Sequence, residues 1–252
     1  MPDYSAGYSA DDVMIVNAAR ALTSDTVCFV GIGLPSTAAN LARRLHAPEC
    51  VLIYESGCIG SKPKHLPLSI GDGELGDTAD AVVSVPEIFA YWLQSGRIDV
   101  GFLGGAQLDR FGNINSTVIG SYDAPKTRLP GAGGAPEIAA SARAVYVIMR
   151  PSARAFGERC DFRSSIGFGD GKGDRERLGL RGGGVQLVVT DLGLLRPDPD
   201  DCELVMTALH PGVTREQAIA ATGWPLRFSA DCTVTDAPSA HELATLAALR
   251  AA

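Results

Sequence analysis

Glu55 is the residue whose type and position most directly suggest chemistry. It follows Val51–Tyr54, a continuous apolar run that predicts a strand buried on both faces. Ser56 and Gly57 come next, so the carboxylate stands at the carboxyl end of this strand. Ligands of open α/β sheets bind at the carboxyl ends of strands, and a carboxylate is costly to desolvate without a partner or a task. This segment alone is consistent with a reactive carboxylate or with a glutamate that points into water.

The other residues with reactive side chains give weaker signals. Ser56 is not in a G-x-S-x-G nucleophile elbow, and the neighbours of Cys58 supply no base, which favours a core thiol over a nucleophile. The histidines lie far apart with no H-x-x-x-H or H-E-x-x-H pattern, so the sequence predicts no metal site. These histidines are His46, His65, His210 and His241.

A glycine turn precedes Glu55 in the chain. The apolar run Val27–Val30 leads into G-I-G-L-P-S at residues 31–36, and a helix is expected over Thr37–Leu45. A strand, a glycine turn and a helix start can present backbone N–H groups to an anion, although the glycines are equally consistent with a simple tight turn. The motif is not a dinucleotide-binding fingerprint, because the third glycine is missing and Pro35 lies inside it.

A second glycine loop and two groups of cations are further candidates for ligand binding. Residues 129–135 read L-P-G-A-G-G-A and lead into a helix that begins at Pro136, a residue suited to a first helical turn. Lys62 and Lys64 come soon after Glu55 and are consistent with solvated loop charges or with phosphate contacts. Arg150, Arg154 and Arg159 are interpreted as a run of surface charges.

Length and composition place the chain among ordinary globular proteins. It has 252 residues, 46% of them hydrophobic, enough for one large α/β domain or two smaller lobes. The net charge of −7 argues against a nucleic-acid face or an anionic membrane surface. Six scattered cysteines, no apolar run long enough to span a membrane and no signal-peptide pattern lead us to expect a cytoplasmic protein.

Short apolar strands alternate with helices along most of the chain, which predicts an α/β fold with a largely parallel sheet covered on both faces. Ser9 and Thr214 are expected to cap helices, and the glycine-rich stretch 164–184 is expected to be a long loop that folds over something or is mobile. Further strands are expected over 81–85, 100–103, 145–149, 186–190, 204–209 and 226–230, and helices over 9–22, 87–95, 214–222 and from 239 onward.

With these segments in hand, the chain resembles the β subunit of class I CoA-transferases, most closely of the glutaconate CoA-transferase type. The resemblance covers nearly the whole chain, and the joint order of its motifs is specific. The motifs are G-x-G-x-P at Gly31–Pro35, E-S-G at Glu55–Gly57, G-G-A-Q-L-D at Gly104–Asp109, G-N-x-N-S-T at Gly112–Thr117, P-K-T-R at Pro125–Arg128, the glycine loop Gly131–Ala135 and R-E-R-L-G-L at Arg175–Leu180.

The resemblance implies a role for each matching residue. Glu55 matches the family's nucleophile, which forms an acyl-glutamyl anhydride and then a glutamyl-CoA thioester in a ping-pong mechanism. The backbone N–H groups of Gly131, Gly133 and Gly134 are the expected oxyanion donors. Residues expected to bind substrate or CoA are Gly31, Gly33, Gln107, Asn113, Lys62, Lys126 and Arg128.

The resemblance also implies an architecture and partners. We expect a single domain over residues 1–252, with the three-layer α/β/α arrangement and largely parallel central sheet of class I CoA-transferases. The activity expected is transfer of CoA between an acyl-CoA and a free carboxylic or dicarboxylic acid, with CoA as a substrate and no other cofactor. The expected partner is an α subunit, in a heterotetramer or larger assembly, with no nucleic acid and no membrane.

Two alternatives remain open at this point. Relatives on the same scaffold could carry out CoA-ester hydrolysis, ring opening or decarboxylation, and Met149-Arg150-Pro151 replaces a stretch that is M-x-H-E in some family members. The presence of Glu55 favours a transferase, because those reactions do not require a nucleophile at this position. The other alternative is a non-catalytic ligand-sensing module, which would need neither this glutamate nor an α partner.

Overall fold

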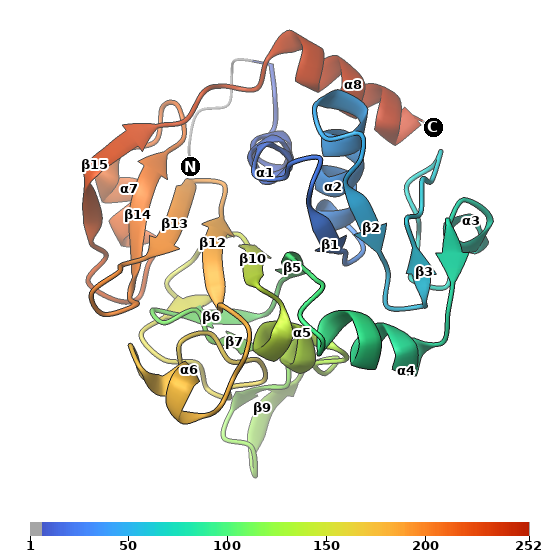
Figure 1. The fold of residues 1–252 in the computed structure, drawn as a ribbon. Helices are drawn as coiled ribbons and strands as arrows, with labels where there is room; N and C mark the ends of the chain where they lie inside the picture. Colours follow the sequence, from blue (N-terminus) through green and yellow to red (C-terminus); the bar gives the residue numbers. More distant parts are fainter. Residues whose placement is uncertain (1–6, 252) are drawn as a thin grey trace. The chain divides into compact units, whose positions relative to one another are not determined.

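The computed structural model describes residues 7–251 (Figure 1), and their contacts divide them into two units. The N-terminal unit contains residues 7–102 and 237–251, and the second unit contains residues 103–236. That the chain acts as a single domain over 1–252 stays a prediction.

The sheet of the N-terminal unit has parallel strands at its centre. β1 pairs in parallel with both β2 and β5, so that Phe29 is opposite Ile53 on one side and Gly101 on the other. β3 and then β4 extend the sheet beyond β2 as antiparallel strands, and β4 is its edge. The bounds are β1 Val27–Phe29, β2 Val51–Ile53, β3 Cys58–Ile59, β4 Ala81–Val82 and β5 Val100–Leu103. The buried apolar runs that predicted β1, β2 and β5 thus form the parallel core.

Helices cover both faces of this sheet. Figure 1 shows the last helix beside the first two, and these three pack on one another. Tyr54 extends from β2 to α2, whereas Phe29 of β1 contacts Phe89 of η1, with ring centroids 5.9 Å apart. Because Phe29 and Ile53 are paired, they share the face opposite to Tyr54. The helices are α1 Ala10–Arg20, α2 Leu34–Leu45, α3 Gly73–Asp77, α4 Val85–Glu87, the π-helix η1 Ile88–Leu93 and α8 Ala240–Ala251.

The expected capping signals are confirmed at α1. The Ser9 hydroxyl accepts a hydrogen bond from the Asp12 backbone N–H at 3.2 Å, and the Asp12 carboxylate accepts one from the Ser9 N–H at 2.8 Å. Two ion pairs then hold the C-terminal helix α8 against α1, Arg20 with Glu242 at 2.7 Å and Arg250 with Asp12 at 2.6 Å. The last helix of the chain is therefore fixed to its first helix.

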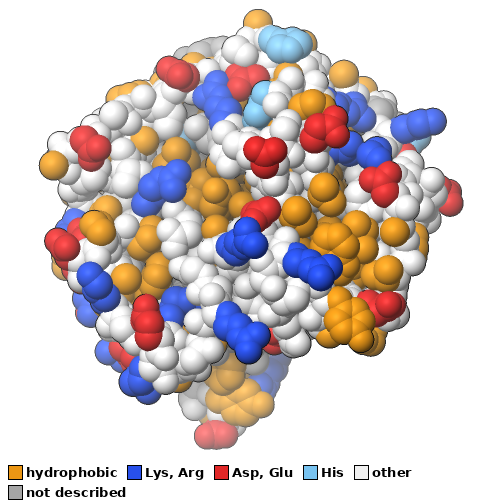
Figure 2. Space-filling model, viewed as in Figure 1, with side chains coloured by type: hydrophobic (Ala, Val, Ile, Leu, Met, Phe, Trp, Pro, Cys, Tyr) orange, Lys and Arg blue, Asp and Glu red, His pale blue; other side chains and the backbone are white. Residues whose placement is uncertain are grey.

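An exposed apolar surface lies at the edge of this unit. Val82, Val85 and Tyr91, which we call the β4 patch, are 61%, 45% and 64% exposed. Figure 2 shows hydrophobic side chains grouped on the side of the molecule where Figure 1 places β3 and α4. Exposed apolar groups at the edge of a sheet are typical of a surface that another chain covers.

The second unit combines parallel and antiparallel strands. Its largest sheet has the order β10-β12-β13-β14-β15, with parallel pairs at β10–β12 and β14–β15. The sequence predicted four of these strands but not β13, which forms an antiparallel hairpin with β12. Thr190 closes that hairpin by accepting a hydrogen bond from the Gly193 N–H at 2.9 Å. The bounds are β10 Ala144–Ile148, β12 Val185–Val189, β13 Gly193–Pro197, β14 Leu204–Leu209 and β15 Phe228–Val234.

Smaller elements complete this unit. β11 pairs in parallel with β6, which pairs with β7, and β8 and β9 form a separate hairpin. Thr214 caps α7 through the predicted capping box with Gln217. The remaining bounds are β6 Gln107–Asp109, β7 Ile114–Asn115, β8 Val118–Gly120, β9 Pro125–Arg128, β11 Phe156–Gly157, α5 Ala135–Ser141, α6 Asp174–Arg177 and α7 Arg215–Ala220.

The long loop over 164–184 is folded over the unit and contains α6. Arg175 anchors it, with only 5% of the residue exposed. Its guanidinium donates hydrogen bonds to the backbone oxygens of Gly167 at 2.7 Å, Gly182 at 2.8 Å and Ala139 at 3.1 Å. Carbonyl groups therefore satisfy this buried cation. Among residues 7–251, no helix is long and apolar enough to cross a membrane.

Candidate active site

Glu55 lies in the tight turn that joins β2 to β3. The Gly57 N–H donates to the Tyr54 backbone oxygen and the Tyr54 N–H donates to the Cys58 backbone oxygen, each at 3.0 Å. Glu55 and Ser56 therefore occupy the two central positions of the turn. Glu55 is half-buried, and its carboxylate has no hydrogen bond or ion pair with any residue in 7–251. The Glu55 carboxylate therefore lies at the carboxyl end of a buried strand with no structural partner in 7–251.

Gly57 is required by the way this turn packs. Its φ is +106°, and a Cβ at this position would lie 1.9 Å from the backbone oxygen of Val83. The Val83 N–H also donates to the Gly57 oxygen at 3.0 Å. Because any side chain would collide with backbone, the glycine of the E-S-G motif fixes the Glu55 turn against the segment that follows β4.

Tyr54 anchors the other side of the turn. Its side chain is completely buried, and its hydroxyl lies 3.2 Å from the Ser36 hydroxyl, within reach also of the Asn40 amide at 3.4 Å. Burial raises the pKa of the Tyr54 phenol, which stays a neutral hydrogen-bonding group. Both partners lie on α2, so the residue before Glu55 is tied to that helix.

The structure brings Gly31 and Gly33 to the same sheet edge as Glu55. β1 and β2 are parallel with Phe29 opposite Ile53, so Gly31 and Glu55 each follow the paired residues by two positions. Gly33 has φ of +85° and is the N-cap of α2, whose first turn contains Pro35. The positive end of the α2 dipole therefore lies at this edge, as an anionic reacting group requires.

Lys62 is in the same unit but near the other end of α2. Its ammonium pairs with Asp80, and it lines a cavity of about 240 Å³ together with Asn40, Arg43, Arg44, Pro63 and Lys64. Arg43 lies nine residues after the start of α2, about 14 Å along the helix axis at about 1.5 Å per residue. We call this group the basic cavity. It is separate from the Glu55 turn.

The predicted oxyanion loop lies in the second unit, before α5. Gly131 and Gly133 have φ of +108° and +52°, and Gly134 caps the helix. The Gly131 N–H already donates to the Ser116 backbone oxygen at 3.0 Å, whereas the N–H groups of Gly133 and Gly134 donate to no residue in 7–251. Of the three expected donors, these two are therefore available to a ligand.

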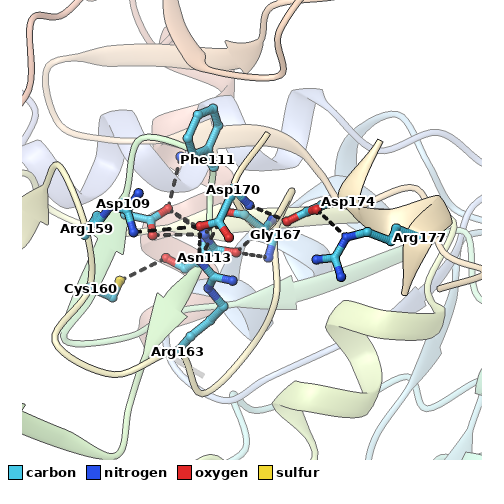
Figure 3. Close-up of polar contacts among 11 residues, drawn as sticks. Asp109, Phe111, Asn113, Arg159, Cys160, Arg163, Gly167, Asp170, Asp174 and Arg177 are labelled. Atoms are coloured by element: carbon cyan, nitrogen blue, oxygen red, sulfur yellow. Dashed lines mark hydrogen bonds and ion pairs between the residues drawn. The ribbon is translucent and has the colours of Figure 1, made fainter. Parts of the chain in front are cut away.

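Asn113 has a structural task in the second unit (Figure 3). It is fully buried, and its amide nitrogen donates to the Asp109 carboxylate at 2.9 Å and to the Gly169 oxygen at 2.7 Å. Its amide oxygen accepts from the N–H groups of Gly167 at 2.9 Å and Gly169 at 3.1 Å. Burial raises the pKa of Asp109, while the hydrogen bonds from Asn113 oppose that rise. These contacts fasten the long loop, and substrate binding by Asn113 stays a prediction.

Gln107, Lys126 and Arg128 also lie in the second unit, but only two of them share a cavity. Gln107 and Lys126 line a cavity of about 650 Å³ with Ala106, Ile119, Thr127, Ser152, Arg154, Ala155 and Asp161. Arg128 instead stacks over the Tyr122 ring, with its guanidinium carbon 4.7 Å from the ring centroid, and donates to the Tyr122 backbone oxygen at 3.0 Å. We call the cavity around Gln107 the Gln107 cavity.

Arg154 is a residue of this cavity that sequence reasoning missed, because it was interpreted as part of a surface charge run. Its position follows from the pairing of β11 with β6, in which the Leu108 N–H donates to the Ala155 oxygen at 2.7 Å. That pairing joins segments that are far apart in the chain, and no spacing in the sequence indicates it. Among residues 7–251, no group of three or more His, Cys, Asp or Glu side chains is arranged to hold a metal ion.

Comparison with known proteins gives a consistent result. A family model described as Coenzyme A transferase matches residues 12–221. The β subunit of the 3-oxoadipate CoA-transferase of Pseudomonas knackmussii is 58% identical over 98% of this chain and 95% of that protein. The β subunit of the glutaconate CoA-transferase of Acidaminococcus fermentans is 39% identical over 91% of this chain and 87% of that protein.

The structural comparison agrees with the sequence comparison. The crystal structure of glutaconate coenzyme A-transferase from Acidaminococcus fermentans superposes with a TM-score of 0.89 and 34% identity. The match covers 96% of this chain and 94% of that one. The α/β fold class that the sequence predicted is therefore confirmed.

Proposed function

The chain belongs to the coenzyme A transferase family as a β subunit, and from this premise we propose that Glu55 is its nucleophile. The observation that carries the proposal is the Glu55 carboxylate itself, which is half-buried at the carboxyl end of β2 and has no partner among residues 7–251. Gly57 and Tyr54 fix its turn from both sides.

The proposed reaction proceeds through two covalent intermediates. A Glu55 oxygen attacks the carbonyl carbon of the acyl-CoA, the C–S bond breaks, and CoA leaves as a thiolate. The thiolate then attacks the glutamyl carbonyl of the mixed anhydride, which releases the acyl group as a carboxylate and leaves CoA on Glu55 as a thioester. The acceptor acid repeats these steps in reverse. No electrons are gained or lost, so the chemistry requires no cofactor besides CoA as substrate.

Each carbonyl attack produces an oxyanion that needs hydrogen-bond donors. We assign this role to the N–H groups of Gly133 and Gly134, because both are available and their loop adopts positive φ only at glycine. Gly131 supports the loop through Ser116 rather than donating to the ligand. Gly31 and Gly33, at the same sheet edge as Glu55, are the second set of groups that we expect to line the site.

The acyl group that we propose is dicarboxylic. The transferases from Pseudomonas knackmussii and Acidaminococcus fermentans are named for 3-oxoadipate and glutaconate, each of which has a carboxylate at both ends. Both are named as transferases, which leaves no reason to prefer hydrolysis, ring opening, decarboxylation or ligand sensing. For CoA itself, we propose that its phosphates bind at the basic cavity through Lys62 and Lys64 with Arg43 and Arg44.

The partner is an α subunit, since the two relatives are each named as one of the subunits of a transferase. The assembly proposed is a heterotetramer or larger, without nucleic acid or membrane. We also propose that the enzyme works in the cytoplasm, since the six cysteines Cys28, Cys50, Cys58, Cys160, Cys202 and Cys232 are all free thiols.

A transfer assay with the assembled enzyme tests this function. The chain is co-expressed with its α subunit, and CoA transfer from succinyl-CoA to adipate and to glutarate is followed by chromatography of the CoA esters. We expect transfer that depends on both chains and that disappears in Glu55→Gln. Hydrolysis of succinyl-CoA without a second CoA ester would show that the chain belongs to a hydrolase.

A further inference from the structure

The Gln107 cavity contains two cations that form no ion pair with any residue in 7–251. Lys126 and Arg154 are both exposed, and neither has a hydrogen bond or ion pair with any residue in 7–251. Arg128, in the same hairpin as Lys126, is engaged by Tyr122 instead. Lys126 and Arg154 are thus available to bind a ligand, whereas Arg128 is held by contacts within the protein.

The Gln107 amide adds a donor whose orientation is fixed. Its oxygen accepts hydrogen bonds from the Asn115 amide at 2.7 Å and from the Asp161 N–H at 3.0 Å. These two donors hold the amide so that its nitrogen is the end without a partner among residues 7–251. A neutral donor fixed in a cavity beside two cations is an arrangement that suits a planar oxyanion.

The charge balance of the cavity favours a ligand with a single negative charge. Asp161 is the one carboxylate among the lining residues, and its oxygen accepts from the Gly120 N–H at 2.8 Å. Two cations against one carboxylate leave one positive charge. A carboxylate matches this balance, whereas the several phosphate charges of CoA would be only partly compensated and would also meet Asp161.

We propose that the Gln107 cavity is a carboxylate subsite, in which Lys126, Arg154 and the Gln107 amide bind one carboxylate of the dicarboxylic substrate. This proposal rests on the proposed function and adds its specificity: the subsite distinguishes a dicarboxylic acid from a monocarboxylic acid of the same length. Arg154 supplies the planar, two-pronged donor and Lys126 a point charge.

The test compares adipate with hexanoate as acceptors, using the complex with the α subunit. Lys126→Gln and Arg154→Gln are each expected to raise the KM for adipate about tenfold and the double variant about a hundredfold, with kcat changed less than about threefold, because a uniform binding contact is lost. Rates with hexanoate and the KM for acetyl-CoA, a donor that has no free carboxylate, are expected to stay within about twofold. Lys172→Gln and Arg159→Gln, which remove surface cations elsewhere in the unit, are the matched controls.

Two results would overturn the proposal. If the variants weaken inhibition by adenosine 3′,5′-bisphosphate and raise the KM for acetyl-CoA equally with both acceptors, the cavity binds a phosphate of CoA. If adipate and hexanoate are unaffected, the cavity binds neither. Calorimetric titration of the wild-type and Arg154→Gln complexes with adipate measures binding to the subsite without turnover. If the wild-type complex is inactive, the proposed function is contradicted, but a difference in adipate binding between the two complexes still tests the subsite.

Discussion

The Tyr54 hydroxyl lies 3.2 Å from the Ser36 hydroxyl, and this contact joins the residue before Glu55 to the first turn of α2. Gly33 caps the same helix at the sheet edge where Glu55 lies. The nucleophile and the positive end of α2 are therefore held in one arrangement by a buried pair of hydroxyl groups.

Tyr54→Phe and Ser36→Ala should each destabilise the protein by about 1 kcal/mol, the typical net value of a neutral hydrogen bond. Because the two hydroxyls are partners, the double variant should cost less than the sum of the two single variants. Urea unfolding of all four proteins gives the coupling energy. Strictly additive free energies would show that the two hydroxyls do not interact.

Gly57→Ala should destabilise the protein by more than about 2 kcal/mol, because it combines a positive φ with a collision against the Val83 oxygen. Gly179→Ala is the matched control, since its φ is +68° but no atom lies within 4 Å of the added Cβ. That control should cost about 1 kcal/mol. Equal losses in the two variants would mean that the Glu55 turn does not press on Val83.

The helix α8 should loosen in acid. Burial alone would raise the pKa of Glu242, but hydrogen bonds from Arg20 and Ser239 outweigh it and lower the pKa to about 2 from its ordinary 4.5. The stability that this lowered pKa contributes is present above pH 4.5 and is lost as the pH falls towards 2.

Glu242→Gln should therefore reduce the free energy of unfolding at about pH 7 and lessen its decline between about pH 5 and pH 2. Urea titrations at several pH values measure both effects. Glu49→Gln, at an exposed loop position, serves as the control and should behave as the wild type. An unaltered pH dependence in Glu242→Gln would contradict the assignment.

The β4 patch should be covered by the α subunit. Val83 links the Glu55 turn to the segment beside this patch, and the covalent intermediates need protection from water, so a partner at this edge would serve both assembly and chemistry. Val82→Lys and Tyr91→Lys should reduce the amount of α subunit that co-purifies with the chain by about tenfold or more. Ile219→Lys, at an exposed apolar position in the second unit, is the control. Loss of a dimer of this chain, while the α partner is still bound, would instead assign the patch to self-association.

Much of the fold could be predicted because local rules specify it. Ser9 and Thr214 cap helices as expected, and the apolar run before Glu55 is a buried parallel strand. β13 was missed because a short strand that starts at glycine and ends at Pro197 has little local signal and depends on pairing with β12. Most of the predicted helix 87–95 is likewise not α-helical, since residues 88–93 form the π-helix η1.

The candidate site was predictable only in part, for a related reason. Glu55 and its glycines stand out because strand, turn and residue type coincide within a few positions. Asn113 meets Gly167 and Gly169 across more than 50 residues, and Arg154 reaches the Gln107 cavity through strand pairing. Contacts of this kind depend on tertiary structure, which no spacing in a single sequence discloses.

The covalent state of Glu55 tests the central claim most directly. The complex is incubated with succinyl-CoA in the absence of an acceptor acid, and the peptide that contains residues 51–62 is analysed by mass spectrometry, with and without borohydride or hydroxylamine trapping. We predict CoA attached to Glu55 as a thioester in the wild type and no adduct in Glu55→Gln, with transfer at least about a thousandfold slower. Glu55→Asp should retain the carboxylate one methylene short and shift the balance from transfer towards hydrolysis. A wild-type peptide without CoA, or a Glu55→Gln enzyme that keeps more than about a tenth of the transfer rate, a loss of under about 1.4 kcal/mol, would contradict the assignment of Glu55 as the nucleophile.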